Sequence, residues 1–150
     1  MHHGAMDELT RRMRDLGADD PAGWAASEIE EGIPQQARFL FLRRIWPDAI
    51  DGWRRGEEIR RIPAGARLLD SGASQDDLAT MLRAAAYEAA FTVVDRIDGG
   101  YDPDAPSDAP GWALMEVGPD DNLTGRVIGG LHESLLGVDP SGRDGADLWE

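Results

Sequence analysis

The sequence predicts an α+β fold: a mostly helical body of four to five helices, followed by one β-hairpin near the C-terminus. Two observations predict this class. Apolar residues recur at helical spacing through most of residues 7–97, and residues 75–97 form the longest such segment. Beyond a proline-rich loop the pattern changes to strand-like alternation over residues 112–128, with turn residues in the middle. A short helix is expected after the hairpin, over residues 131–136.

Three helices are expected in the first third of the chain. Residues 7–16 carry apolar side chains at helical spacing. Asp19 or Asp20 can cap a second helix that has Pro21 in its first turn. Residues 35–46 form the third, and its apolar side chains lie on two of its sides. A helix that is apolar on two sides is usually buried, so we expect this one at the centre of the body.

Residues 75–97 are expected to form one continuous helix, also at the centre of the fold. Ser74 can cap its first turn, with Asp77 at the capping-box position. An apolar stripe runs along the segment and is expected to face the core. Its members are Leu78, Met81, Leu82, Ala85, Ala89 and Val93. Gly99 and Gly100 are expected to end the helix.

Residues 6–150 are expected to form a single α+β domain, because 150 residues is a usual size for one domain. Residues 1–5 are expected to be a native leader or a protease-cleavage scar, because Gly4 and Ala5 precede a second methionine, Met6. The chain has no cysteine, which excludes disulfides and thiolate metal sites. No apolar run reaches the roughly 20 residues that span a bilayer. The bacterial cytoplasm is the expected compartment.

Charge is distributed unevenly along the chain. Residues 1–33 have 3 arginines and 8 acids, residues 34–67 have 8 arginines and 4 acids, and residues 68–150 have 4 arginines and 17 acids. Two interpretations stay open. The basic middle can pair with the acidic half through arginine–carboxylate ion pairs. Alternatively, the acidic half can be a docking face for a basic protein.

Basic and aromatic residues alternate in the middle of the chain, a pattern that nucleic-acid and membrane surfaces share. Helical spacing instead directs Trp46, Ile50 and Trp53 inward and leaves the neighbouring arginines in water. These arginines are Arg43, Arg44, Arg54, Arg55, Arg60 and Arg61. The whole chain has a formal net charge of −14, which phosphate repels. We therefore expect neither nucleic acid nor a membrane as a partner.

Asp70, Ser71 and Gly72 follow two leucines and resemble the Asp-Ser-Gly signature of aspartic proteases. That resemblance implies two aspartates about 3 Å apart that share one proton. In the retroviral type, two copies of the chain supply them. The family carries this motif in a loop between strands, whereas here Ser74 begins a long helix. We therefore predict that Asp70 is not catalytic.

Glu88 lies at the margin of the predicted apolar stripe, beside Met81 and Thr92. A carboxylate that is partly removed from water can serve as a general acid or base. His132 could partner Glu88 if the short C-terminal helix packs on the long one. Glu88 and His132 are thus the candidate catalytic residues of a small hydrolase. The alternative interpretation is that Glu88 is a structural carboxylate paired with an arginine.

Residues 101–110 form a loop rich in proline and aspartate. Asp102, Asp104 and Asp108 are its candidate binding residues, exposed to a basic partner. The aspartates do not match a calcium-binding loop, because Pro103 interrupts them and the required bidentate glutamate is missing. We expect no metal ion and no cofactor.

Gly129 and Gly130 precede a helix start, where free backbone amides can bind an anion. They lack the other residues of a phosphate-binding loop and suit a tight turn. The function that the sequence favours is a non-catalytic acidic module, similar to an inhibitor or immunity protein, that docks a basic protein partner. The small hydrolase is the alternative. A homodimer is a further expectation, because a lone hairpin is marginal in water and can pair with another chain.

Overall fold

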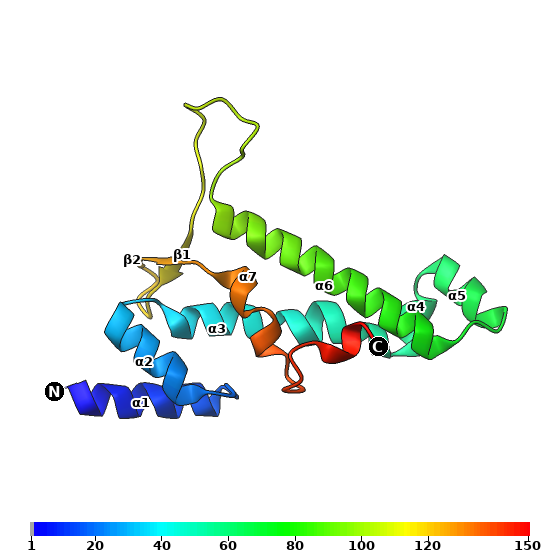
Figure 1. Cartoon of the computed structure of the whole chain (residues 1–150), viewed down its shortest axis with the longest axis horizontal. Helices are drawn as coiled ribbons and strands as arrows, with labels where there is room; N and C mark the ends of the chain where they lie inside the picture. Colours follow the sequence, from blue (N-terminus) through cyan, green and yellow to red (C-terminus); the bar gives the residue numbers. More distant parts are fainter. Residues whose placement is uncertain (1) are drawn as a thin grey trace.

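The computed structural model describes residues 2–150, and it confirms an α+β architecture (Figure 1). Within that range the chain forms seven α-helices and one two-stranded antiparallel sheet. The helices are α1 (His2–Asp15), α2 (Pro21–Glu31), α3 (Gln35–Arg43), α4 (Gly56–Arg60), α5 (Pro63–Asp70), α6 (Gln75–Gly99) and α7 (Leu131–Ser134), and the strands are β1 (Leu114–Val117) and β2 (Leu123–Ile128). None of the helices in the described range combines the length and the apolar composition that crossing a membrane requires.

Helices α1 and α2 pack together at one end of the molecule (Figure 1). Asp20 caps α2, as expected, because its carboxylate accepts a hydrogen bond from the Gly23 amide at 3.0 Å. Met13 on α1 is buried and connects this pair to the main core. α1 begins at His2, so residues 2–5 continue the helix, while Met1 lies outside the described residues.

Helix α3 is shorter than predicted, because Pro47 has no amide hydrogen to continue the regular hydrogen bonding. The chain instead forms a π-helical turn (Trp46–Ile50) and then a 3-10 turn (Asp51–Arg54). Only one of the two apolar sides of α3 is buried: Phe39 and Leu42 lie in the core, whereas Leu40 and Phe41 are exposed. The expected central place of the helix is therefore confirmed, but its second side is only partly covered, by contacts of Ala37 and Ile45 with the core.

Two short helices, α4 and α5, precede the long helix, so the body has more helices than expected. α5 begins at Pro63, which fits the first turn of a helix, and ends at Asp70. Gly72 has a φ of +90°, a left-handed conformation that glycine adopts readily. The turn leads directly to Ser74, which caps α6. The Asp-Ser-Gly motif therefore lies at the C-terminus of a helix and not between strands.

Helix α6 is one continuous helix of 25 residues, and Ser74 Oγ accepts a hydrogen bond from the Asp77 amide at 3.2 Å. The side of α6 that faces the core is only partly the predicted one: Leu78 is buried and Leu82 packs beside it, as expected. The buried residues are Leu78, Ala79, Arg83, Tyr87 and Val94. Of the predicted stripe, Met81, Ala85, Ala89 and Val93 are exposed.

The rest of the predicted stripe faces solvent because the helix is apolar on two sides, and Arg83 interrupts the apolar pattern on the inner side. Arg83 is buried through ion pairs with Asp51 at 2.9 Å and Asp147 at 3.1 Å. Both aspartates are distant in sequence, so helical periodicity cannot reveal them. A buried charge with hydrogen-bonded partners can lie on a core-facing side.

Strands β1 and β2 pair with Leu114 opposite Ile128 and Val117 opposite Leu123. Ile128 is buried in the main core, and β2 lies against α3. Trp112, just before β1, donates its ring N–H to the backbone carbonyl oxygen of Arg96 on α6 at 2.9 Å. These contacts stabilise a hairpin that would be marginal by itself.

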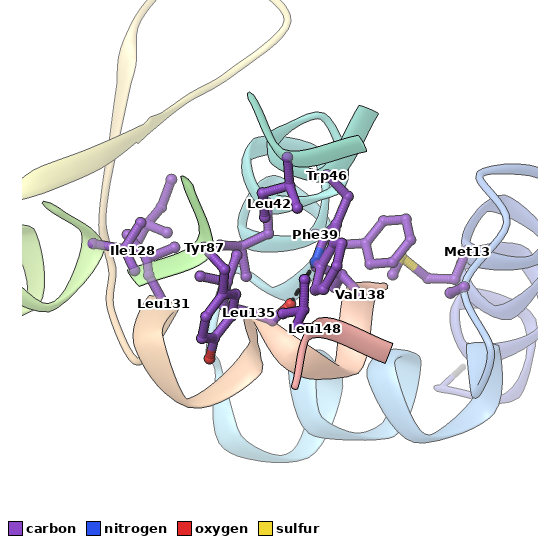
Figure 2. Close-up of a cluster of buried hydrophobic side chains, with 13 residues drawn as sticks. Met13, Phe39, Leu42, Trp46, Tyr87, Ile128, Leu131, Leu135, Val138 and Leu148 are labelled. Atoms are coloured by element: carbon purple, nitrogen blue, oxygen red, sulfur yellow. Dashed lines mark hydrogen bonds between the residues drawn. The ribbon is translucent and has the colours of Figure 1, made fainter. Parts of the chain in front are cut away.

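The main core lies between α3, α6 and the C-terminal segment that follows the hairpin (Figure 2). Trp46 is fully buried there, and its ring N–H donates to the backbone carbonyl oxygen of Leu135 at 2.8 Å. The predicted inward position of Trp46 is therefore confirmed, and Arg54 and Arg55 are exposed as expected. Leu148 brings the C-terminal end of the chain into the same core.

Candidate functional site

His132 on α7 and Asp98 near the end of α6 form the closest histidine–carboxylate pair in the described part of the chain. His132 Nδ1 lies 2.6 Å from Asp98 Oδ2, and Asp95 Oδ1 is 3.9 Å from the same nitrogen. The side chain of Asp98 is 8% exposed, whereas that of His132 is 31% exposed. The ring of Phe91 packs edge-on against the imidazole at 5.8 Å. The imidazole is thus fixed in orientation while it still reaches solvent.

Asp98 also occupies the N-terminus of α7. Its Oδ2 accepts a hydrogen bond from the His132 amide at 2.9 Å, and the Leu131 amide donates to the same carboxyl group. Gly130 enters the helix with a φ of +63°, which a residue with a side chain rarely adopts. The amides of Leu131 and His132 at the start of α7, which could otherwise bind an anion, are therefore taken by a carboxylate of the chain itself.

Arg38 on α3 forms the third part of this cluster. It is buried, and its guanidinium donates to the backbone carbonyl oxygen of Gly130 and, at 3.3 Å, to Gln35 Oε1. The guanidinium also lies over the ring of Trp24, 5.8 Å from its centroid, which is the distance of a cation–π contact. Two buried polar atoms, Arg38 Nε and Asp98 Oδ1, have no hydrogen-bond partner within residues 2–150.

The pKa shifts of His132 and Asp98 favour the charged form of both side chains. The hydrogen bond to Asp98 is the main reason that the pKa of His132 is raised above its usual value. Burial acts to raise the pKa of Asp98, but the amide and ring hydrogen bonds of His132 outweigh it, and the pKa is lowered. Burial lowers the pKa of Arg38, although Glu133 and Asp98 oppose that effect.

A histidine held by a buried carboxylate is an arrangement that can take up and release a proton. A cavity of about 330 Å³ opens on the Arg38 side of the cluster, lined by Trp24, Gln35, Arg38 and Ser134 among others. His132 does not line it. The cluster therefore has an acid–base group and a cavity, but the two are not combined into one pocket.

Glu88 does not join this cluster. It is exposed on α6, and its carboxylate makes no hydrogen bond or ion pair within residues 2–150; only its backbone oxygen accepts one, from Thr92. The expectation that Glu88 is partly desolvated is wrong, because it was placed beside a stripe that faces solvent. α7 does pack on α6, as the catalytic hypothesis required. The carboxylate that meets His132 is Asp98.

The aspartates of the predicted binding loop lie at the surface of the molecule. Asp102, Asp104 and Asp108 are exposed, and the loop that carries them projects beyond the end of α6 (Figure 1). Its base is closed by Trp112, whose amide donates to the Gly100 carbonyl at 2.8 Å. Inside the loop, the Asp104 amide donates to Asp102 Oδ1 at 3.0 Å. The aspartates are thus displayed by an anchored loop.

An apolar surface that the sequence did not single out lies on the outer face of the hairpin that follows this loop in the chain. Val117, Leu123 and Val127 are 55%, 67% and 54% exposed, and Met115 lies opposite Val127 on the same face. The alternation of the two strands places these residues on one side, while Ile128 points into the core. We call Met115, Val117, Leu123 and Val127 the hairpin face.

Ion pairs also join the basic middle of the chain to its acidic half, as one interpretation of the charge pattern predicted. Arg54 contacts Asp147 at 2.6 Å, and Arg60 contacts Asp70 at 2.7 Å. Asp70 is thus an exposed partner of an arginine at the end of a helix. The exposed aspartates of the projecting loop make no such pairs within the described chain, so the second interpretation still applies to them.

Sequence reasoning missed Asp98, Arg38 and Arg83. Asp98 lies only two residues before Gly100 and close to the aspartates of the loop, so its position in the sequence does not indicate a buried carboxylate. Nothing in the sequence singles out Arg38 and Arg83, because a buried arginine looks the same in sequence as an exposed one. In the described residues no group of three or more histidine, aspartate or glutamate side chains is suited to hold a metal ion.

Compared with protein-family models, with curated proteins and with solved structures, the chain shows no match.

Proposed function

We propose that the chain is a non-catalytic protein-binding module that docks a basic partner through its acidic C-terminal half. The observation that carries the proposal is the combination of the uncovered hairpin face with the projecting aspartate loop that precedes it in the chain. An inhibitor or immunity protein would use such a surface. On composition, we place the protein in the bacterial cytoplasm.

The hairpin face supplies the apolar centre of the proposed interface. Val117, Leu123 and Val127 each leave more than half of their surface in water. Covering apolar surface stabilises a complex by about 25 cal/mol per Å². Contact surfaces commonly have an apolar centre and a polar rim. The hairpin turn adds Asp120 and Asp121 to that rim, and both are exposed.

The loop supplies long-range attraction. Asp102, Asp104 and Asp108 lie on a projection, where their field extends into solvent with little compensation from arginines of the chain. Charges at a rim mainly raise the association rate of an oppositely charged protein, and salt screens them over about 10 Å at 0.1 M. The partner should therefore be basic around an apolar contact.

A displayed library of random peptides tests both parts of the proposal. Selection on the folded protein should enrich peptides that combine lysine or arginine with apolar residues. Replacing Asp102, Asp104 and Asp108 by arginine should abolish the enrichment of basic residues. A matched control reverses three exposed acids at the other end of the molecule, Asp7, Glu30 and Glu31, and should leave the selection unchanged.

Two results would overturn the proposal. One is a selection with no preference for basic peptides. The other is an equal loss of basic-residue enrichment in the loop variant and in the control variant, which would mean that only the net charge of the protein matters. Replacing Leu123 by serine should weaken the binding of the selected peptides without changing the preference for basic residues, because this substitution removes apolar contact only.

A small hydrolase is the second candidate, favoured by the contact between His132 and Asp98. In this form of the hypothesis Asp98 takes the role that was expected of Glu88. Ester or phosphodiester substrates with a chromogenic leaving group would detect the activity. It should disappear in both His132→Ala and Asp98→Asn and persist in Glu88→Gln.

A further inference from the structure

The cavity beside Arg38 is lined by buried polar side chains from three helices. Arg38 and Gln35 line it from α3, Trp24 and Ser27 from α2, and Ser134 from α7. Arg38 is only 9% exposed and Gln35 only 6% exposed. The volume of about 330 Å³ lies at the lower end of the range for small-molecule sites. The cavity therefore has room for a small polar molecule.

Arg38 brings a buried positive charge to this cavity without a carboxylate in contact. No aspartate or glutamate between residues 2 and 150 forms an ion pair with it. Burial lowers the pKa of Arg38, and Glu133 and Asp98 offset only part of that effect from beyond ion-pair distance. The guanidinium donates to Gln35 and to the Gly130 carbonyl, and its Nε has no partner. Because a buried charge is costly without a counter-ion, an anionic group on a ligand would be stabilised here.

The other groups around the cavity are mostly hydrogen-bond donors. Neither the ring N–H of Trp24 nor the hydroxyl of Ser134 donates to another residue in the described chain. Ser27 Oγ already accepts a hydrogen bond from Gln35 Nε2 at 2.8 Å, so its own hydrogen is free to donate. The guanidinium of Arg38 covers one face of the Trp24 ring, 5.8 Å from its centroid, and leaves that face closed to a stacked base or sugar. A lining of donors suits a carboxylate, which only accepts hydrogen bonds.

Asp20 adds one negative charge to the same cavity. It is exposed, and its Oδ1 caps α2 through the Gly23 amide. Its Oδ2 accepts no hydrogen bond from any residue between positions 2 and 150. Asp20, together with Asp98 and Glu133, would repel a dianion such as phosphate. The cavity thus combines a buried cation with an exposed anion, which suits a ligand that carries one charge of each sign.

We propose that this cavity binds a free α-amino acid, whose carboxylate pairs with Arg38 and whose ammonium group pairs with Asp20. The carboxylate is the counter-ion that the guanidinium lacks, and such charge-assisted pairs are among the stronger hydrogen bonds. The Trp24 ring N–H and the Ser134 hydroxyl are the further donors available to it. The proposal does not rest on the docking function, because no residue that lines this cavity belongs to the hairpin face or to the loop of residues 101–110.

Calorimetric titration with single compounds tests the class of ligand. Among the common amino acids, at least one should bind with a dissociation constant of about 1 mM or lower. The same compound without its amine should bind about tenfold more weakly or worse, and the same compound without its carboxylate should not bind. For alanine, these two analogues are propionate and ethylamine. Inorganic phosphate should bind more weakly than the amino acid, because the three acids near the cavity repel it.

Two substitutions test the roles of the charged residues. Arg38→Lys should weaken binding about tenfold or more, because an ammonium group does not reproduce the planar fork of a guanidinium. Arg43→Lys, on the same helix but outside the cavity, is its matched control. Asp20→Asn keeps a residue that caps α2 equally well and should remove the advantage of the amino acid over its amine-free analogue. Asp19→Asn, its exposed neighbour outside the cavity, should retain that advantage.

A second variant and a direct signal keep the test independent of the stability of Arg38→Lys. Ser134→Leu should block the cavity while Arg38 stays in place, and it should abolish binding. In the wild-type protein, the NMR signal of the Arg38 Nε–H group should shift with the amino acid and stay unchanged with ethylamine. The proposal would be overturned if no common amino acid bound the folded wild type at about 1 mM or tighter. Equal losses in Arg38→Lys and Arg43→Lys, or phosphate binding as tight as that of the best amino acid, would also overturn it.

The same variants separate this site from the proposed docking surface. Ser134→Leu should abolish amino-acid binding and leave the selection of basic peptides intact. The triple reversal of Asp102, Asp104 and Asp108 should do the opposite. Loss of both activities in Ser134→Leu, with circular dichroism unchanged, would contradict the separation of the two sites.

Discussion

Two buried polar clusters lie on the inner side of α6, and they are built differently. At Arg83 the guanidinium is 4% exposed and contacts two carboxylates, those of Asp51 and Asp147. At Asp98 the carboxylate is held by amides of α7 and by the imidazole of His132, and the nearby Arg38 has no carboxylate partner. The first cluster consists of ion pairs between one arginine and two aspartates. The second is a chain of hydrogen bonds in which two buried polar atoms have no partner.

The difference teaches how to separate a structural charge from a functional one. Burial is common to Arg83 and Arg38, so burial alone does not indicate function. What distinguishes the second cluster is His132, a group whose usual pKa lies near neutrality and whose ring reaches solvent. Only that cluster can change its charge in the physiological range. The four predictions below test whether the distinction holds.

The largest effect is expected from Arg83→Met. The substitution leaves Asp51 and Asp147 without their buried partner, and breaking a buried ion pair in this way costs about 3–5 kcal/mol. Urea denaturation should show this loss in the free energy of unfolding. Arg54→Met is the matched control: Arg54 contacts the same two aspartates from an exposed position and should cost about 1 kcal/mol or less. Equal losses in the two variants would mean that burial of Arg83 adds nothing.

A smaller loss is expected from Arg38→Met. Arg38 has hydrogen bonds to backbone and amide oxygens but no ion pair, so its removal leaves no unpaired carboxylate in contact. We expect about 1–3 kcal/mol, the cost of leaving a buried acceptor at Gly130 unsatisfied. The same urea titration measures it. If Arg38→Met destabilises the protein more than Arg83→Met does, the contrast between the two clusters is wrong.

The third prediction concerns pH. The pKa of His132 is raised in the folded state, so its protonated form stabilises the fold. This stabilisation is fully present below about pH 6.5 and is lost as the pH rises through the pKa of His132 in the folded state. The pKa of Asp98 is lowered in the folded state, so its ionised form stabilises the fold. This stabilisation is fully present above about pH 4 and is lost as the pH falls through the pKa of Asp98 in the folded state. The contribution of the pair is therefore greatest between these limits. In Asp98→Asn, the imidazole should titrate lower by NMR, and the stability difference from wild type should shrink above neutrality. An unchanged titration of His132 would refute the coupling.

The sequence predicts where most helices and strands lie, but it does not predict which side of a helix faces the core. Capping by Asp20 and Ser74, the length of α6 and the hairpin after the proline-rich loop all depend on neighbouring residues, and local patterns predict them. The inner side of α6 depends on Arg83 meeting Asp147, a contact across 64 positions. The pairing of His132 with Asp98, and not with Glu88, likewise depends on how α7 sits on α6. Long-range partners of charged groups leave no periodic signal in one sequence.

The smallest effect is expected on the outer side of α6, where a new charge needs no partner. Ala85 was predicted to lie in the core, which would make Ala85→Arg costly, but the residue is exposed. Ala85→Arg should change the free energy of unfolding by about 0.5 kcal/mol or less. Ala79→Arg, on the buried side of the same helix, should cost several times more, because Ala79 packs against Ile59 and Leu78 and a larger side chain would displace them. Both variants add one arginine to α6, so helix propensity and net charge change equally. Thermal or urea unfolding of the pair therefore reports only which side faces the core, and equal stabilities would return Ala85 to the interior.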